Sequence, residues 1–158
     1  MHDLMMTAVQ GDADAAYQLG YLYETGDGVP QDEKEALRWY SMGAQKGHSK
    51  AQFNLAVMLE EGRGQVTDLR KAFFWYEKAA QQGESNAQYN LALFCTLGKG
   101  CEVNLVLAHM WFAWAARKGS SDAIHKRDAV AKQLKAEQLS LSQQWVAQWI
   151  EKHSAAKS

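Results

Sequence analysis

The sequence has one proline and two cysteines among its 158 residues, and its net charge is only −1. The two cysteines, Cys95 and Cys101, are too few for a disulfide framework, and the five residues between them match no common zinc or redox motif. We therefore expect both to be reduced, structural thiols. The pI near 6.5 lacks the basic signature of a nucleic-acid-binding protein, so no nucleic-acid partner is expected.

Long hydrophobic runs and catalytic signatures are also missing. No stretch approaches the roughly 20 apolar residues of a membrane span, and the N-terminus lacks the basic and apolar segments of a signal peptide. The sequence contains no H-E-x-x-H, G-x-S-x-G, Walker loop or paired metal-ligand cysteines, and no two histidines are four residues apart. We expect a cytoplasmic protein without membrane partner, catalytic residue, metal or cofactor.

Glycine is abundant by contrast, and its recurrence exposes an internal repeat. The segment AQFNLA at Ala51 aligns with AQYNLA at Ala87, a displacement of 36 residues. Without gaps, the same displacement superimposes a row of tryptophans and two rows of glycines: Trp39, Trp75 and Trp111; Gly26, Gly62 and Gly98; Gly28, Gly64 and Gly100. So many coincidences at one spacing indicate three successive copies of one unit.

Each copy is predicted to form two helices, helix A and helix B. Ser49 and Ser85, each followed by glutamine three residues later, are predicted to cap helix A of the second and third copies. A glycine in left-handed conformation then ends helix A. Helix B is predicted to begin at an Asp or Asn cap, namely Asp32, Asp68 or Asn104. Packing explains the tryptophan row of helix B, whereas Trp114 has no counterpart and is predicted to dock a C-terminal helix or a partner.

The predicted fold is all-α: one right-handed α-solenoid over residues 1–158, with about three full repeats and terminal capping helices. Its predicted segments are a partial helix (1–10), three repeats (11–46, 47–82 and 83–118), a degenerate repeat with a C-terminal capping helix (119–153) and a frayed tail (154–158). In the degenerate repeat, Ser121 is predicted to cap a helix in the register of helix A.

The second copy carries a recognisable family pattern. From Ala51 to Gly83 it reads A-Q-x-N-L-A, then G-x-G, then an Asp cap, then K-A-x-x-W-Y-x-K-A-A-x-x-G. This pattern resembles the Sel-one-like repeat, a relative of the tetratricopeptide repeat, and the resemblance covers residues 11–122. It implies that helix A lines a concave wall. The third copy departs from the pattern where Cys95 replaces the usual tyrosine.

Helix A carries a second apolar face opposite its leucines. When the repeats stack, the equivalent side chains of this face line up and form a row, the helix A ladder. In related tetratricopeptide proteins, asparagines beside this face bond the backbone of a bound peptide. The candidate partner-binding residues are Tyr17, Tyr21, Phe53, Asn54, Val57, Tyr89, Asn90, Leu93, His125 and Lys126. The alternative is structural: the ladder packs between repeats, and the asparagines bond within the scaffold or face water.

The predicted function is a non-enzymatic, bacterial-type adaptor that binds a peptide or protein segment on its concave helix A surface. Acidic Glu60 and Glu61 and basic Lys126 and Lys132 would orient such a segment. The oligomeric state is left open, with a monomer favoured. The alternative function is an enzyme of the β-lactam-binding or hydrolysing type described for cysteine-rich relatives, although their repeated cysteine pairs are missing here.

Overall fold

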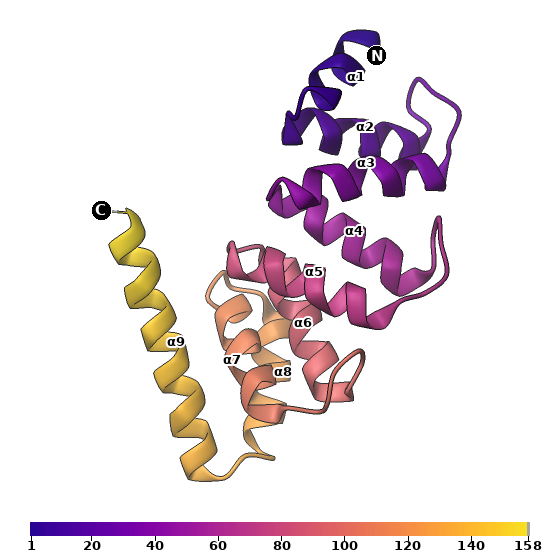
Figure 1. The fold of residues 1–158 in the computed structure, drawn as a ribbon. Helices are drawn as coiled ribbons and strands as arrows, with labels where there is room; N and C mark the ends of the chain where they lie inside the picture. Colours follow the sequence, from indigo (N-terminus) through magenta and orange to yellow (C-terminus); the bar gives the residue numbers. More distant parts are fainter. Residues whose placement is uncertain (158) are drawn as a thin grey trace. The chain divides into compact units, whose positions relative to one another are not determined.

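The fold is described from a computed structural model, which defines the backbone of residues 1–157 and the side chains of residues 1–152. Every regular element of this part of the chain is an α-helix (Figure 1). The helices are α1 (His2–Val9), α2 (Ala13–Thr25), α3 (Glu33–Gln45), α4 (Ser49–Glu61), α5 (Leu69–Gln81), α6 (Ser85–Leu97), α7 (Leu105–Ala116), α8 (Ser121–Ala131) and α9 (Ala136–Lys157). None of these described helices has both the length and the apolar character needed to cross a membrane.

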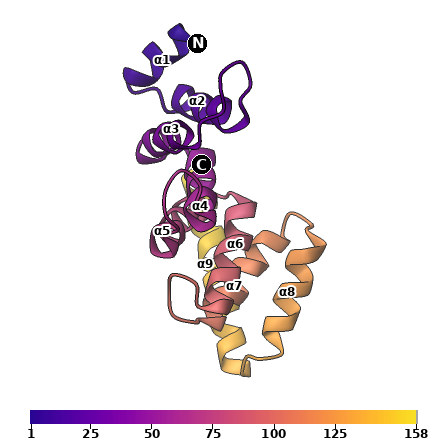
Figure 2. The same cartoon turned by 90° about the vertical axis from the view of Figure 1, so that its right-hand side faces the viewer.

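Helices α2 to α7 form three consecutive pairs, in which helix A (α2, α4 or α6) packs against the following helix B (α3, α5 or α7) (Figures 1 and 2). Each helix A ends at a glycine with positive φ: Gly26 at 75°, Gly62 at 71° and Gly98 at 71°. Glycine adopts this left-handed conformation at little cost, which allows the chain to turn towards helix B. The predicted all-α solenoid of helix pairs is confirmed.

Contacts divide the chain, predicted from the sequence to be one domain, into two compact units. Unit 1 (Met1–Glu84) contains α1 to α5. Part of its core is formed by Ala8, Ala15, Ala16, Leu19 and Trp39, against which Leu4, Met5, Tyr23 and Met42 pack. Removing a side chain such as Leu19 from water contributes about 1.5–3 kcal/mol, so α1 is fixed by apolar contacts with α2 and α3.

Small residues allow helix A and helix B of a pair to approach closely. Gly20 of α2 faces the fully buried ring of Tyr40 in α3, and a Cβ atom added at Gly20 would collide with that ring. The equivalent residues of α4 and α6 are Ala56 and Ala92, both buried. At this position the first pair has no room for a Cβ atom, whereas the other two pairs accommodate one.

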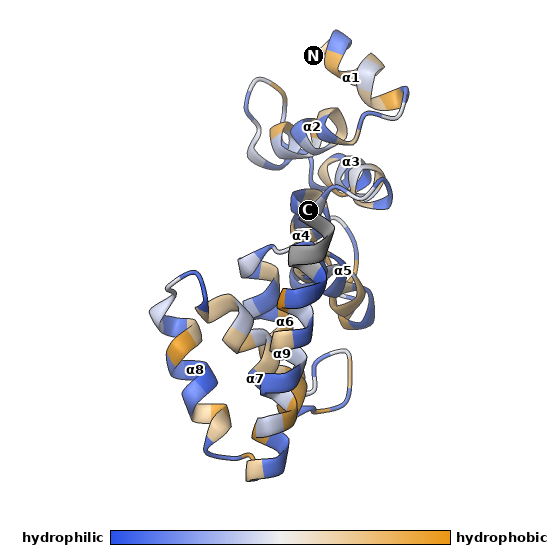
Figure 3. Ribbon diagram, turned by 90° about the vertical axis from the view of Figure 1, so that its left-hand side faces the viewer, coloured by the Kyte–Doolittle hydropathy of each residue, from blue (hydrophilic) through white to orange (hydrophobic). Residues whose placement is uncertain are grey.

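Unit 2 (from Ser85 onward) contains α6 to α9. Its helix α7 contacts both α8 and α9 (Figure 2). The ring of Trp149 in α9 meets Trp111 and Trp114 edge-on, with centroid distances of 5.5 and 6.1 Å. The prediction that Trp114 docks the C-terminal helix is confirmed. Hydrophobic residues alternate with hydrophilic ones along α9, as Figure 3 shows, and its backbone is helical up to Lys157.

The predicted C-terminal tail falls partly outside the described residues. Side chains from His153 onward and all of Ser158 are not described, so the tail prediction is not tested there. The tryptophan row is buried at Trp39 and Trp111, as predicted for a core position, but Trp75 is only half-buried.

The helix B caps are confirmed, whereas the helix A caps are shifted by one residue. Side-chain oxygens of Asp32, Asp68 and Asn104 accept hydrogen bonds from backbone N–H groups of α3, α5 and α7. The prediction of Ser49 as a cap is wrong, because His48 Nδ1 accepts from Ala51 N at 3.2 Å and Ser49 is already helical. Likewise Ser120, not Ser121, caps α8. The prediction of Ser85 as a cap is also wrong, because Ser85 is the first helical residue of α6.

Candidate functional site

The ten predicted partner-binding residues are divided equally between the two units. In unit 1, Tyr17 and Tyr21 belong to α2, and Phe53, Asn54 and Val57 belong to α4, two helices that contact each other. In unit 2, α6 contributes Tyr89, Asn90 and Leu93, whereas α8 contributes His125 and Lys126. Most are half-buried, but Tyr21, His125 and Lys126 are exposed.

A repeated aromatic contact fixes the ladder residues of helix A. Each helix A ring packs against a buried ring of helix B in the same repeat. The centroid distances are 6.0 Å for Tyr17 and Tyr40, 5.9 Å for Phe53 and Tyr76, and 5.6 Å for Tyr89 and Phe112. One side of each ladder ring therefore belongs to the scaffold, and its half-exposed remainder can meet a ligand.

Tyr17 has a second aromatic contact, with the capping residue of the next helix. Its ring stacks on His48 with a centroid distance of 4.7 Å and an interplanar angle of 17°. Because His48 Nδ1 accepts the backbone bond at the start of α4, its Nε2 carries the proton and faces Asp14 Oδ1 at 3.4 Å. The cap thus orients the imidazole, and the imidazole in turn holds the Tyr17 ring.

A hollow of about 280 Å³ lies on the exposed side of α2, lined by Tyr17, Gln18, Tyr21 and Leu22. Tyr21 is 49% exposed, although it is a large aromatic side chain. Gln18 Nε2 donates to Asp14 Oδ2 at 2.7 Å, which leaves the side-chain oxygen of Gln18 available. The hollow therefore combines ring faces with an amide acceptor.

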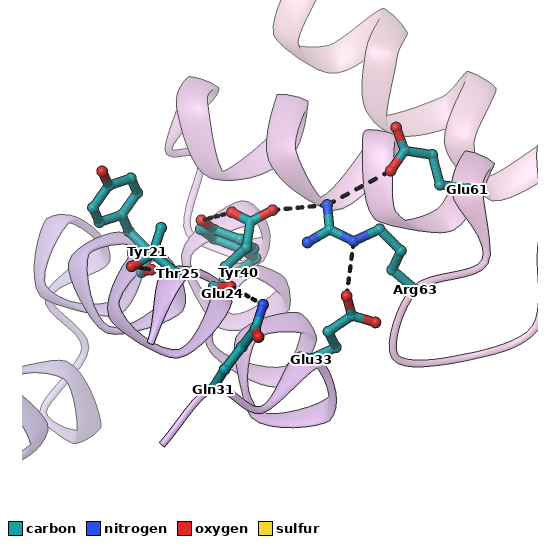
Figure 4. A network of polar contacts seen from close by, with 8 residues as sticks. All are labelled: Tyr21, Glu24, Thr25, Gln31, Glu33, Tyr40, Glu61 and Arg63. Carbon is teal, nitrogen blue, oxygen red and sulfur yellow. Dashed lines mark hydrogen bonds and ion pairs between the residues drawn. The ribbon is translucent and has the colours of Figure 1, made fainter. Parts of the chain in front are cut away.

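A polar network beside this hollow links α2, α3 and the loop after α4 (Figure 4). The Tyr40 hydroxyl donates to Glu24 Oε1 at 2.7 Å, and Arg63 Nη1 lies 2.9 Å from Glu24 Oε2. Arg63 also contacts Glu33 through Nε at 3.1 Å and Glu61 through Nη1 at 3.6 Å. Three carboxylates surround one guanidinium, so this part of unit 1 keeps negative charge.

Burial, followed by the hydrogen bond to Glu24, raises the pKa of Tyr40 above its ordinary range, whereas the side chain of Asn54 lowers that pKa by hydrogen bonding. Asn54, a candidate for peptide contacts, thus also serves the scaffold. The second pair repeats the bond, since the Tyr76 hydroxyl donates to Glu60 Oε1 at 2.7 Å. Our sequence reasoning missed this network, although a displacement of 36 residues relates the two tyrosine–glutamate pairs.

Unit 2 has a more polar hollow at the start of α6. Its volume is about 440 Å³, and its lining residues are Ser85, Asn86, Tyr89, Ala115, Lys118, Gly119, Ser120 and Asp122. Of the predicted residues, only Tyr89 lines it. The predicted members of α8, His125 and Lys126, point to solvent rather than into an apolar ladder. The register of α8 is thus retained without its aromatic character.

A buried polar pair joins α7 to α9. His109 Nδ1 lies 2.7 Å from Ser142 Oγ, and both side chains are buried. Burial, followed by the proximity of Arg127, lowers the pKa of His109. Burial also raises the pKa of the Cys101 thiol. Among the described side chains, no group of three or more His, Cys, Asp or Glu residues is arranged to hold a metal ion.

Comparison with known proteins identifies the repeats. Three consecutive segments match the family model of the Sel1 repeat, at residues 13–48, 49–84 and 85–120. No curated protein matches the sequence significantly. A Sel1 repeat protein from Oxalobacter formigenes is 38% identical, with a TM-score of 0.74 over 81% of this chain and 96% of that chain.

Two further solved structures are similar. The protective antigen c5321 of uropathogenic Escherichia coli, which displays an SLR fold, is 30% identical with a TM-score of 0.71, over 94% of this chain but 40% of that chain. Cysteine-rich protein B of Helicobacter pylori shares the fold at 24% identity and a TM-score of 0.60, over 78% of this chain and 93% of that chain. The repeats, their spacing and these similarities show that the chain belongs to the Sel1 repeat family.

Proposed function

We propose that this chain is a non-enzymatic scaffold that binds an extended segment of a partner protein, and that α2 and α4 form the binding face of unit 1. Sel1 repeat proteins are generally protein-interaction scaffolds and typically non-catalytic. The observation that carries the proposal is the hollow of about 280 Å³ beside the half-exposed ring of Tyr21. Exposed aromatic side chains next to a concave apolar surface are typical of ligand-binding sites.

The chemistry of this face indicates the kind of segment. An apolar side chain would enter the hollow, where Tyr17 and Tyr21 supply ring surface. The amides of Gln18 and Asn54 would bond the backbone of the segment, because an amide both donates and accepts. Unit 1 contains 8 basic and 13 acidic side chains, so a Lys or Arg next to the apolar side chain is favoured.

Unit 2 presents the same helix A positions in different surroundings. Tyr89, Asn90 and Leu93 repeat the pattern of α4, and His125 and Lys126 follow on α8. Unit 2 contains 9 basic and 5 acidic side chains, so this face favours a neutral or acidic segment. A concave surface that uses both faces stays a prediction.

The test is selection of peptides from a random phage-displayed library on the full chain. Enriched peptides should share an apolar residue next to Lys or Arg. Tyr21→Ala should weaken their binding about tenfold, as truncation of a central aromatic contact does, with an unchanged melting temperature. Val66→Ala is the matched control, because Val66 is 86% exposed in the loop after α4 and lies outside the hollow.

Two results would contradict the proposal. Peptides that bind wild type and Tyr21→Ala equally well would place the site elsewhere. Peptides that lack any apolar residue would assign binding to the acidic surface of unit 1 and leave the ladder as packing.

A further inference from the structure

The outer positions of helix B are covered differently in the three repeats. In the third repeat, Trp111 and Trp114 meet Trp149 of α9. In the first repeat, Trp39 and Met42 pack in one cluster with Leu4 and Met5 of α1. These are equivalent positions, since 36 residues separate 39 from 75 from 111, and 42 from 78 from 114. In both repeats, residues of a terminal helix thus pack with these helix B residues: α9 against α7, and α1 within the cluster that α2 and α3 share.

In the second repeat, α5 has the half-buried Trp75 and the exposed Lys78 at these positions, and Phe74 beside them presents aromatic surface to solvent. Phe74 is 47% exposed, and its ring meets half-buried Trp75 edge-on at a centroid distance of 4.9 Å. Lys78, which replaces the Met42 and Trp114 of the other repeats, places its Nζ 5.4 Å from the centroid of Phe74. An exposed phenylalanine held between a tryptophan and a cation is a preformed contact surface.

The charges around Phe74 oppose those of the rest of unit 1. Arg70 and Lys71 precede it by four and three residues and Lys78 follows it by four, so all three share its side of the helix. All three are exposed, and no carboxylate among the described side chains pairs with them. The acidic residue of α5 is the half-buried Glu77. A basic rim thus surrounds an aromatic centre, on a unit whose net charge is −5.

We propose that this α5 face, formed by Arg70, Lys71, Phe74, Trp75 and Lys78, docks an acidic amphipathic helix of a partner protein. The helix places an aromatic residue against Phe74 and Trp75, as α9 places Trp149 against Trp111 and Trp114. Its flanking carboxylates pair with the basic rim. This surface lies on helix B and is independent of the helix A face proposed above.

A second copy of this chain fits the α5 face less well. The aromatic helix that a second copy could offer is α9, whose two acidic and two basic residues cancel: Glu137, Glu151, Lys152 and Lys157. Charge complementarity therefore favours a different partner, and self-association becomes an outcome that the test must separate.

The experiment measures fluorescence anisotropy of labelled peptides with the full chain. The probe is a synthetic helical peptide about five turns long, with one tryptophan flanked by glutamates at helical spacing. A matched peptide carries lysines in place of the glutamates. The glutamate peptide should bind more tightly than the lysine peptide, with an affinity that falls as salt is added. Phe74→Ala should weaken binding about tenfold.

Charge reversal sharpens the test. Lys71→Glu with Lys78→Glu should abolish the preference for the glutamate peptide and favour the lysine peptide. Arg38→Ala, an exposed change at the position of α3 equivalent to Phe74, should leave binding unchanged, as should Tyr21→Ala on the helix A face. Equal binding of the two peptides, equal binding to wild type and Phe74→Ala, or a concentration-dependent dimer that Phe74→Ala abolishes would each overturn the proposal.

Discussion

In unit 1 both helix pairs contain a tyrosine–glutamate hydrogen bond, whereas unit 2 has Phe112 and Thr96 at the equivalent positions. Both partners are exchanged together. Phe112 is fully buried without a polar atom, and Thr96 Oγ1 donates to Ala92 O of its own helix at 2.8 Å. A buried hydroxyl needs an acceptor, so the loss of the carboxylate requires the loss of the hydroxyl.

The two units also hold their helices together by different interactions. Unit 1 begins with the short α1, and the ion pairs of Arg63 link its two helix pairs. In unit 2, the long α9 packs against helix B (α7) through three tryptophans and the His109–Ser142 pair. Their net charges are −5 and +4. The same repeat backbone can therefore be stabilised by ion pairs or by aromatic contacts, provided that each buried polar group keeps a partner.

The largest expected effect tests the aromatic contacts between α7 and α9. Trp111→Ala removes a ring that is 5% exposed and contacts Trp149, and we expect it to cost about 3–5 kcal/mol of unfolding free energy. Hydrogen exchange read by mass spectrometry should show that backbone amides of α9 lose protection first. Trp75→Ala, at the half-buried equivalent position, should cost less. Equal costs would contradict the role assigned to α9.

A smaller effect tests why unit 2 has Phe112 and Thr96 in place of the tyrosine–glutamate pair. Phe112→Tyr places a hydroxyl where unit 2 has no carboxylate, and we expect a loss of about 1–3 kcal/mol in urea unfolding. Adding Thr96→Glu should recover most of this loss by recreating the pair of unit 1. A Phe112→Tyr variant as stable as wild type would show that water or another group satisfies the hydroxyl.

The smallest expected effects are opposite responses of the two units to pH. The pKa of Tyr40 is raised, so unit 1 keeps a proton that the unfolded chain loses, and its stability falls as the pH rises above 10.0, the ordinary tyrosine value. The pKa of His109 is lowered, so unit 2 resists a proton that the unfolded chain binds, and its stability falls as the pH drops below 6.5.

Two variants separate these responses. Tyr40→Phe should make the decrease in unfolding free energy at alkaline pH smaller than in wild type. His109→Leu with Ser142→Ala should do the same for the decrease at acidic pH. The His109 variant also removes the interactions with Arg127 and Asp128 of α8, the charged groups that act on this imidazole. Urea unfolding of each variant and wild type across the pH range provides the measurement. Parallel profiles for wild type and variant would contradict the assigned group.

The sequence predicted features that recur with the 36-residue spacing. The helix B caps at Asp32 and Asp68 follow from a residue type that is common at N-caps, and the closing glycines follow from their need for positive φ. The helix A caps were misplaced because the true position varies in chemistry, with Asp12, His48 and Ser120 at equivalent places. Histidine is an uncommon cap, and the adjacent Ser49 resembled a better one.

Hydrogen bonds between different helices were not predicted, because the repeat pattern shows which residues recur and not which of them meet. Tyr40 and Glu24 are 16 residues apart on different helices, and His109 and Ser142 are 33 apart. Half-burial of the helix A ladder depends on the rings behind it, such as Tyr76 behind Phe53, which periodicity alone does not reveal. The exposed surface of Phe74 was not predicted either, because the repeats have no aromatic row at this position, where Arg38 and Met110 are the equivalents.

The position of Arg63 also constrains how such an array can be rearranged. The Tyr40–Glu24 bond lies within one repeat and would travel with it, but Arg63 reaches from the second repeat to Glu24 and Glu33 of the first. Asp27 and Lys99 occupy its place in the other repeats. A repeat that is moved elsewhere in the array would therefore keep its internal hydrogen bond but lose the ion pairs of Arg63 with its neighbour. The repeats are thus not interchangeable in order.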